Sequence, residues 1–202
     1  MTAPEDAKPN VIEPLDPAKH DRAAFSCGIE QVDNFFRRTA NKLVKADNVR
    51  TFVMVGPAGE LIGFYAANAH AIDYTELPDR FARNRPAHGS IPAAYISMIG
   101  VDSRFQGRGY GGDLLVDCLT RLASVANALG IAVVVLDVLD CGDPEKVAKR
   151  RALYTSYGFE PLPSNELRLF LPALPANGNS SNAYRRHPAM IPSGPSEFAT
   201  GF

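Results

Sequence analysis

The sequence contains few cysteines, and they are not placed to form a framework. Cys27, Cys118 and Cys141 make an odd number, and no two of them form a C-x-x-C pair. A disulfide scaffold or a zinc site would need paired or clustered thiols. We therefore expect reduced thiols and no metal site.

Long apolar runs and a dominant charge are also missing. No stretch approaches the roughly 20 apolar residues that span a bilayer. The first residues, MTAPEDAKPN, lack the basic and apolar regions of a secretory signal. We expect a cytoplasmic protein without membrane association. The net charge of −1 supplies no global field for nucleic acid, so RNA binding would need a local basic patch.

What is present is the composition of one globular domain. The 202 residues are 46% hydrophobic and 21% charged, which allows a sizeable core. We expect a flexible lead over residues 1–10, a folded domain over 11–174, and a disordered tail over 175–202, which is rich in Pro, Asn, Ser and Gly.

Hydrophobic periodicity and turn residues predict an α/β fold with a mixed sheet and helices on its faces. Residues 70–92 are expected to form a long loop, at most partly helical. The expected elements are a helix at 29–46, a hairpin of 51–56 and 61–69, a strand at 93–101, a helix at 111–128 ended by Gly130, a strand at 131–137, a helix opened by Asp143 and Pro144, and a last strand in NELRLFLPAL.

The stretch from Tyr95 to Gly130 is the most informative part of the chain. It joins an apolar run, YISMIGV, to the loop DSRFQGRGYGG and the amphipathic run DLLVDCLTRLASVANALG. Glycines let a backbone approach a ligand closely, and the N–H groups at the start of the helix then face negative charge. A strand, a glycine-rich loop and a helix in this order predict a cradle for phosphate groups.

Two kinds of nucleotide-bearing cofactor fit this cradle. Gly107, Gly109 and Gly112 satisfy the dinucleotide pattern G-x-G-x-x-G, with Asp137 at the end of the next strand. That pattern needs its first glycine directly after the strand and several further strand and helix units, whereas only about forty ordered residues follow. The alternative, Gln106-x-x-Gly109-x-Gly111, resembles the acetyl-CoA signature of the Gcn5-related N-acetyltransferases, and we favour it.

A second motif strengthens this resemblance. Ala152-Leu153-Tyr154-x-x-Tyr157-Gly158-Phe159 is similar to the catalytic segment of the superfamily. The segments FSCG, VDNFFRR and RTFV nearer the N-terminus resemble the acetyltransferase toxins of bacterial type II toxin–antitoxin systems. The likeness covers about residues 10–172. It implies a twisted mixed sheet of six or seven strands, with a splayed central strand pair that binds acetyl-CoA.

The resemblance also implies a set of site residues. The strand end at Ile99, Gly100 and Val101 would pair with the pantetheine arm as an added strand does. The loop would wrap the pyrophosphate through Gln106, Gly107, Arg108, Gly109, Tyr110, Gly111 and Gly112. Tyr154 would be the catalytic acid that protonates the departing thiolate. Tyr157 and Phe159 are expected to pack in the core, and no general base stands out.

Toxins of this type acetylate the α-amine of aminoacyl-tRNA, which requires a basic surface. Arg38, Lys42 and Lys45 recur at helical spacing opposite the apolar stripe of the first helix, with Arg37 beside them. Further clusters are Arg80, Arg83 and Arg85 in the long loop, and Lys146, Lys149, Arg150 and Arg151 in the last helix. The resemblance also admits a ribbon-helix-helix antitoxin and a homodimer.

The chain departs from the toxin pattern in two ways. Its total charge is close to neutral, and the segment DVLDCGDPEKVAKRRALY is longer than usual. Transfer of the acetyl group to a small-molecule or protein amine therefore remains an alternative. A module that binds acetyl-CoA without catalysis is a third reading.

Overall fold

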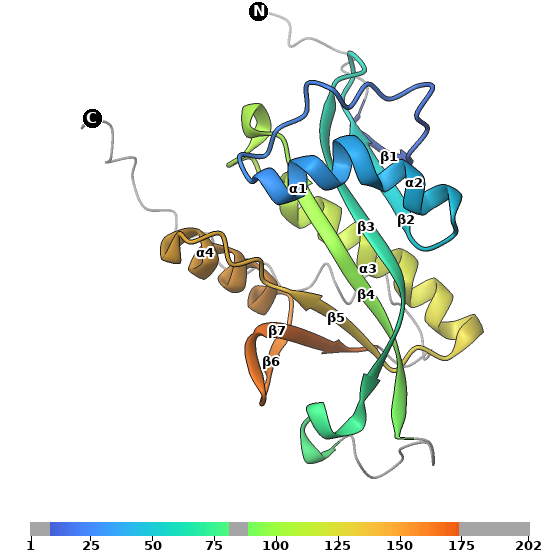
Figure 1. Ribbon diagram of the computed structural model, residues 1–202, viewed down its shortest axis with the longest axis vertical. Helices are drawn as coiled ribbons and strands as arrows, with labels where there is room; N and C mark the ends of the chain where they lie inside the picture. The colour runs from blue at the N-terminus through green and yellow to red at the C-terminus, as the bar shows by residue number, and fades with distance from the viewer. Residues whose placement is uncertain (1–8, 81–88, 174–202) are drawn as a thin grey trace, which may run out of the picture.

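A computed structural model describes residues 9–80 and 89–173 of the chain. They form a seven-stranded sheet in the order β1-β2-β3-β4-β5-β7-β6, with helices on both faces (Figure 1). The strands are β1 (Val11–Pro14), β2 (Arg50–Val55), β3 (Leu61–Asp73), β4 (Ser90–Val101), β5 (Val133–Asp137), β6 (Glu160–Leu162) and β7 (Asn165–Pro172). The main helices are α1 (Glu30–Asn34), α2 (Ala40–Lys45), α3 (Tyr110–Leu129) and α4 (Pro144–Ser156).

Strands β3 and β4 form a long antiparallel pair, with Gly63 opposite Val101 at one end and Asp73 opposite Ser90 at the other. The predicted hairpin of β2 and β3 is confirmed, but the expectation of a loop from residue 70 to residue 92 was wrong at both ends. Near the end of this pair at Asp73 and Ser90, side chains alternate between the two faces of the sheet, and Ile72 and Ile91 are buried. This period of two is the pattern of a strand, which the prolines nearby obscured.

The predicted first helix is confirmed with one irregularity. Between α1 and α2 lies a π-helical turn, η1 (Phe35–Thr39), which adds a residue to the helical path. Val32, Phe36 and Ala40 are buried on the side that faces the sheet. The rings of Phe36 and Phe64 stack with centroids 4.1 Å apart. This aromatic contact fixes the first helix on one face of the sheet.

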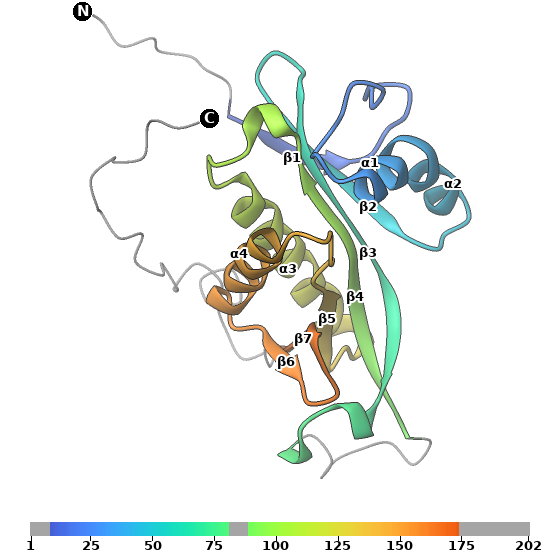
Figure 2. The same ribbon diagram turned by 60° about the vertical axis from the view of Figure 1, so that its left-hand side comes forward.

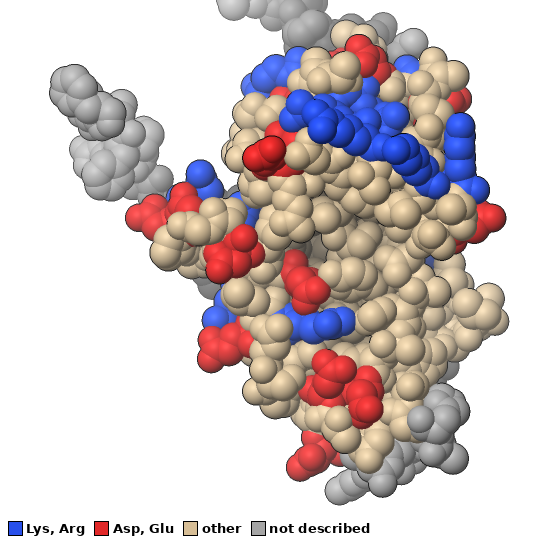
Figure 3. Space-filling view, viewed as in Figure 1, with Lys and Arg blue, Asp and Glu red and all other residues tan. Residues whose placement is uncertain are grey.

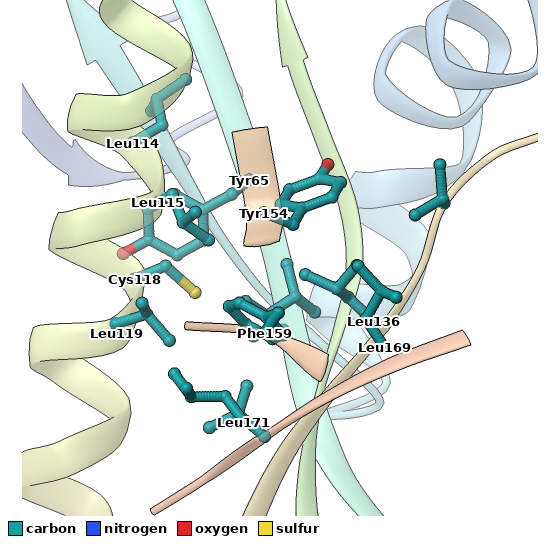
Figure 4. Close-up of a cluster of buried hydrophobic side chains, with 14 of the residues drawn as sticks. Tyr65, Leu114, Leu115, Cys118, Leu119, Leu136, Tyr154, Phe159, Leu169 and Leu171 are labelled. Carbon is teal, nitrogen blue, oxygen red and sulfur yellow. The ribbon is translucent and has the colours of Figure 1, made fainter. Parts of the chain in front are cut away.

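Helices α3 and α4 cover the opposite face of the sheet (Figure 2). Leu114, Leu115, Cys118 and Leu119 of α3 pack against Tyr154 and Phe159 and the strands beneath (Figure 4). Gly130 ends α3 with φ of 71°, in the left-handed conformation that glycine tolerates, as predicted.

The start of α4 also follows the prediction. The Asp143 carboxylate accepts hydrogen bonds from the N–H groups of Glu145 and Lys146, and Pro144 occupies the first turn. Strand β6 was not predicted, because three residues are too few to show a pattern. Within the described ranges, no helix is long and apolar enough to cross a membrane. The expected tail lies wholly outside the described residues, and the lead lies almost wholly outside them.

Candidate active site

The centre of the sheet opens where β4 and β5 part. These two strands are parallel, and their register runs from Ala93 opposite Val133 to Ile96 opposite Leu136. Ser97 is then an extra residue, because Ile96 and Met98 oppose the adjacent residues Ala67 and Ala66 of β3. A β-bulge of this kind bends its strand. The splayed strand pair expected from the sequence is therefore present, with the last residues of β4 beyond the β5 ladder.

A pocket of about 640 Å³ lies at this opening, a size typical of ligand sites. Its walls come from the end of β4, the loop before α3, the segment before α1, and one face of α4. The lining residues are Cys27, Gly28, Ile29, Ile99, Gly100, Val101, Ser103, Gln106, Gly107, Gly111, Lys146, Lys149, Arg150, Leu153 and Tyr154.

The loop before α3 has the conformation of a phosphate cradle. Gly107 and Gly109 have φ of 76° and 86°, values that other residues rarely adopt. Helix α3 begins directly after Gly109, whose carbonyl accepts from the N–H groups of Gly112 and Asp113, so the N–H groups of Tyr110 and Gly111 are the first-turn donors left for a ligand. The loop thus presents backbone donors and the positive end of the α3 dipole beside the pocket.

Six of the ten predicted cofactor residues line the pocket: Ile99, Gly100, Val101, Gln106, Gly107 and Gly111. The other four occupy different positions. Arg108 stacks over the ring of Phe105, with 5.6 Å from its guanidinium carbon to the ring centroid. Gly109 is the N-cap of α3, and Tyr110 packs against the core. Gly112 faces Tyr157, whose hydroxyl oxygen would lie 2.5 Å from an added Cβ.

Gln106 connects two walls of the pocket. Its side-chain amide nitrogen donates to the carbonyl oxygens of Cys27 and Val101, each at 2.9 Å. Part of the polar backbone at the end of β4 is therefore already paired within the protein. The Gln106 side chain positions the loop, and its backbone remains at the pocket surface.

Tyr154 places a phenol at the inner end of the pocket. Its side chain comes from the last turns of α4 and is only 6% exposed, and its hydroxyl points away from Phe159 (Figure 4). Burial raises the pKa of Tyr154 to about 12, opposed by the positive charge of Arg150. The hydroxyl is consequently protonated throughout the neutral range and can donate a hydrogen bond.

The segment Phe25–Gly28 was recognised from sequence only as a family likeness, yet its last two residues, Cys27 and Gly28, line the pocket together with Ile29. Two buried carboxylates hold it in place. Asp33 accepts from the Ser26 hydroxyl and the Cys27 N–H, both at 2.7 Å. Asp102 accepts from the Ser26 N–H at 3.2 Å and from Arg104 Nε at 2.8 Å. Burial opposes ionisation of Asp102, but these hydrogen bonds and the Arg104 charge lower its pKa below the ordinary value.

Replacing Asp102 by asparagine should destabilise the fold by on the order of 2 kcal/mol at pH 7, because charge-assisted bonds at a buried site are lost. A carboxyl whose pKa is lowered on folding contributes stability above its unfolded pKa of about 4 and loses it as pH falls further. In urea unfolding, the difference in the free energy of unfolding between wild type and variant should therefore become smaller below about pH 4.

Asp47→Asn is the matched control for this measurement. Asp47 is exposed, pairs with Arg50, and has φ of 56°, which asparagine also tolerates. Its loss should cost less than about 1 kcal/mol at any pH. An equal loss in both variants would contradict the role assigned to Asp102.

Basic side chains gather on the outer side of the first helix. Arg37 and Arg38 of η1 and Lys42 and Lys45 of α2 are exposed, and Figure 3 shows a row of Lys and Arg atoms over this part of the molecule. We call these four residues the basic row. Arg37 is partly engaged, since it pairs with Asp33 at 3.1 Å. In the predicted loop cluster, Arg80 pairs with Glu160 at 2.7 Å, and Arg83 and Arg85 lie outside the described residues.

The mixed sheet with a splayed β4–β5 pair, the glycine loop opening α3 and a buried tyrosine beside them define the Gcn5-related N-acetyltransferase fold. No family model matches the chain. Among solved structures, AtaT complexed with acetyl-methionyl-tRNAfMet superposes with a TM-score of 0.71 at 24% identity, over 81% of this chain and 95% of that one. A tyrosine-to-phenylalanine variant of KacT gives 0.72 at 22% identity, over 82% and 96%. These likenesses establish the fold.

Among the curated proteins that are similar in sequence, two carry names that describe toxins. A protein of Sinorhizobium fredii (strain NBRC 101917 / NGR234) named "Probable toxin TacT" is 66% identical over 167 residues, which cover 82% of this chain and 92% of that protein. The tRNA-acetylating toxin of Mycobacterium tuberculosis (strain ATCC 25618 / H37Rv) is 30% identical over 151 residues, 75% and 85% respectively. The chain belongs to this family of acetyltransferase toxins, as its N-terminal segments predicted.

Proposed function

We propose that the protein transfers the acetyl group of acetyl-CoA to the α-amine of aminoacyl-tRNA. The observation that carries this proposal is the position of Tyr154, buried in the same pocket as the free end of β4 and the loop before α3. The names of the relatives support it: one is a tRNA-acetylating toxin, and a related structure contains AtaTR bound with AcCoA.

In this proposal the pocket binds acetyl-CoA along its length. The backbone of Ile99 and Gly100 pairs with the pantetheine arm, because β5 leaves this part of β4 unpaired, while the Val101 carbonyl is paired with Gln106. The N–H groups at Gly107 and the first turn of α3 bind the pyrophosphate. Arg108 lies in the same loop with its guanidinium over the Phe105 ring, and it adds positive charge near the pyrophosphate.

The chemistry needs positioning and one proton donor. The neutral amine attacks the thioester carbonyl, a C–N bond forms, and the C–S bond breaks. The Tyr154 hydroxyl donates its proton to the leaving sulfur and regains one from water, while the proton of the new ammonium passes to solvent. Because its pKa is about 12, Tyr154 remains protonated until it donates its proton to the leaving sulfur.

The basic row supplies the surface for the RNA backbone. Arg38, Lys42 and Lys45 are exposed on one side of the helix whose other side packs on the sheet. We propose an antitoxin partner as well, since a related structure shows AtaT bound to the C-terminus of the antitoxin AtaR. A ribbon-helix-helix antitoxin, a homodimer, a catalytic domain over about residues 11–174 and a cytoplasmic location are further parts of the proposal.

The test is an acetylation assay with the purified protein and labelled acetyl-CoA. A panel of charged tRNAs is offered, with uncharged tRNA, polyamines and protein lysines as competing acceptors. We expect label on the α-amine of aminoacyl-tRNA and none on uncharged tRNA. Label on polyamines or proteins with charged tRNA unmodified would refute the RNA acceptor, and CoA binding without turnover on any acceptor would refute the enzyme.

A further inference from the structure

One face of α4, from Lys146 to Tyr154, forms a wall of the pocket. Lys146, Lys149, Arg150, Leu153 and Tyr154 all line the pocket. Their spacing places them on a single helical face. The face is buried at Tyr154 and exposed at Lys146 and Lys149. The pocket therefore changes along α4 from an apolar inner end at the phenol to a cationic outer end.

The packing of α4 brings its C-terminal half beside the start of α3, and its cationic end lines the same pocket as the glycine loop. Gly111 and Gly112, in the first turn of α3, approach Leu153 of α4 and Tyr157, which follows α4, with Leu153 Cδ2 3.8 Å from the position of a Gly111 Cβ. Figure 2 shows α4 beside the start of α3. The preceding turns of α4, which carry the two lysines, share the pocket with Gln106 and Gly107.

The three cations differ in how much of their charge is already engaged. Arg150 donates to the Leu139 carbonyl at 2.9 Å and contacts the Cys141 sulfur, so it holds the β5–α4 connection. Lys146 pairs with Asp143 at 3.2 Å. No ion pair is found for Lys149 within residues 9–80 and 89–173. Lys149, followed by Lys146, is the charge most available to a ligand.

Apart from the pairing of Lys146 with Asp143, these groups meet no carboxylate inside the described part of the pocket. Among the described residues that line it, three are cationic and none is acidic. The neighbouring pocket, which shares Lys146, is different because it is lined by Glu30, Asp140 and Asp143. On the outer surface of α4 basic and acidic atoms are interspersed, unlike on the basic row (Figure 3). An RNA backbone laid on α4 would meet these carboxylates, whereas an anion inside the pocket would not.

We propose that Lys146 and Lys149 bind phosphate groups of acetyl-CoA, so that α4 belongs to the donor site and the basic row alone serves the RNA. This inference rests on the proposed function. The glycine loop offers N–H groups and a helix end worth about half a positive charge, which is too little to balance a pyrophosphate and a 3′-phosphate. Two lysines on the facing wall add two positive charges next to these phosphates.

The experiment measures CoA binding directly by isothermal titration calorimetry, without any acceptor. Wild type is compared with Lys146→Ala/Lys149→Ala and with Arg151→Ala, a control on the same helix that pairs with Glu166 and does not line the pocket. The double variant should raise the Kd for CoA by about tenfold or more, and the control should leave it unchanged. In turnover assays the KM for acetyl-CoA should rise and the KM for aminoacyl-tRNA should not.

Dephospho-CoA identifies the phosphate that is bound. If the effect of the double variant disappears with this ligand, the lysines contact the 3′-phosphate, and if it persists they contact the pyrophosphate. Unchanged CoA binding with a raised KM for aminoacyl-tRNA would overturn the inference and return α4 to the RNA surface. A wild-type protein that does not bind CoA would overturn the proposed function, and this inference with it.

Discussion

Replacing Tyr154 by phenylalanine should lower kcat by about 10²- to 10⁴-fold, the usual contribution of a positioned proton donor. The ring of Tyr154 packs against Phe159, and phenylalanine preserves this contact. CoA affinity and melting temperature should therefore change little. Steady-state acetylation of aminoacyl-tRNA measures the effect, and expression in a host strain should no longer arrest growth.

Tyr157→Phe is the control for this prediction. Tyr157 directly follows the last residue of α4, one turn after Tyr154. Its hydroxyl faces Gly112 of α3, and it does not line the pocket. This variant should keep most of the wild-type kcat. If Tyr154→Phe retained full activity, another donor would have to protonate the sulfur, and the mechanism above would be wrong.

Removing charge from the basic row should have the second large effect. The triple variant Arg38→Ala/Lys42→Ala/Lys45→Ala should lower kcat/KM for aminoacyl-tRNA by about a hundredfold, with the Kd for CoA unchanged. Each lost phosphate contact also removes one released counterion. The slope of log kcat/KM against log salt should consequently become shallower by about two to three.

A charge-preserving triple, Arg38→Lys/Lys42→Arg/Lys45→Arg, separates charge from shape. If the row acts through the phosphate backbone, this variant should retain both affinity and salt dependence within a few-fold. All three side chains are exposed, so neither variant should unfold the protein. An unchanged kcat/KM in the alanine triple would place the RNA elsewhere on the molecule.

The parts of the site that were predictable from sequence are those carried by local patterns. The loop before α3 and the cap of α4 depend on glycine, aspartate and proline at fixed spacing, and both were located correctly. The length of β3 was not recognised, because the prolines that follow favoured a loop, whereas pairing with β4 extends the strand to Asp73. Local sequence preference favoured a loop in this segment, whereas tertiary pairing makes it a strand.

The pocket wall at Cys27–Ile29, anchored through Ser26, could not be recognised from a local sequence pattern. Its position depends on hydrogen bonds to Asp102, which is 76 residues away from Ser26 along the chain. Buried carboxylates of this kind look like ordinary surface charges in a sequence. The position of the α4 lysines was equally hard to predict. The sequence shows that these lysines exist, but only the packing of α4 on Gly111 shows which pocket they line.

The bulge at Ser97 makes the pocket depend on the number of residues in β4 as well as on their identity. If β4 were shortened by one residue at this point, it would continue to pair with β5 beyond Ile96. The opening between the two strands, called the slot below, would then close. Side-chain substitutions that spare the backbone would leave the slot in place. A single-residue deletion would remove the binding slot itself, even with every lining side chain still encoded.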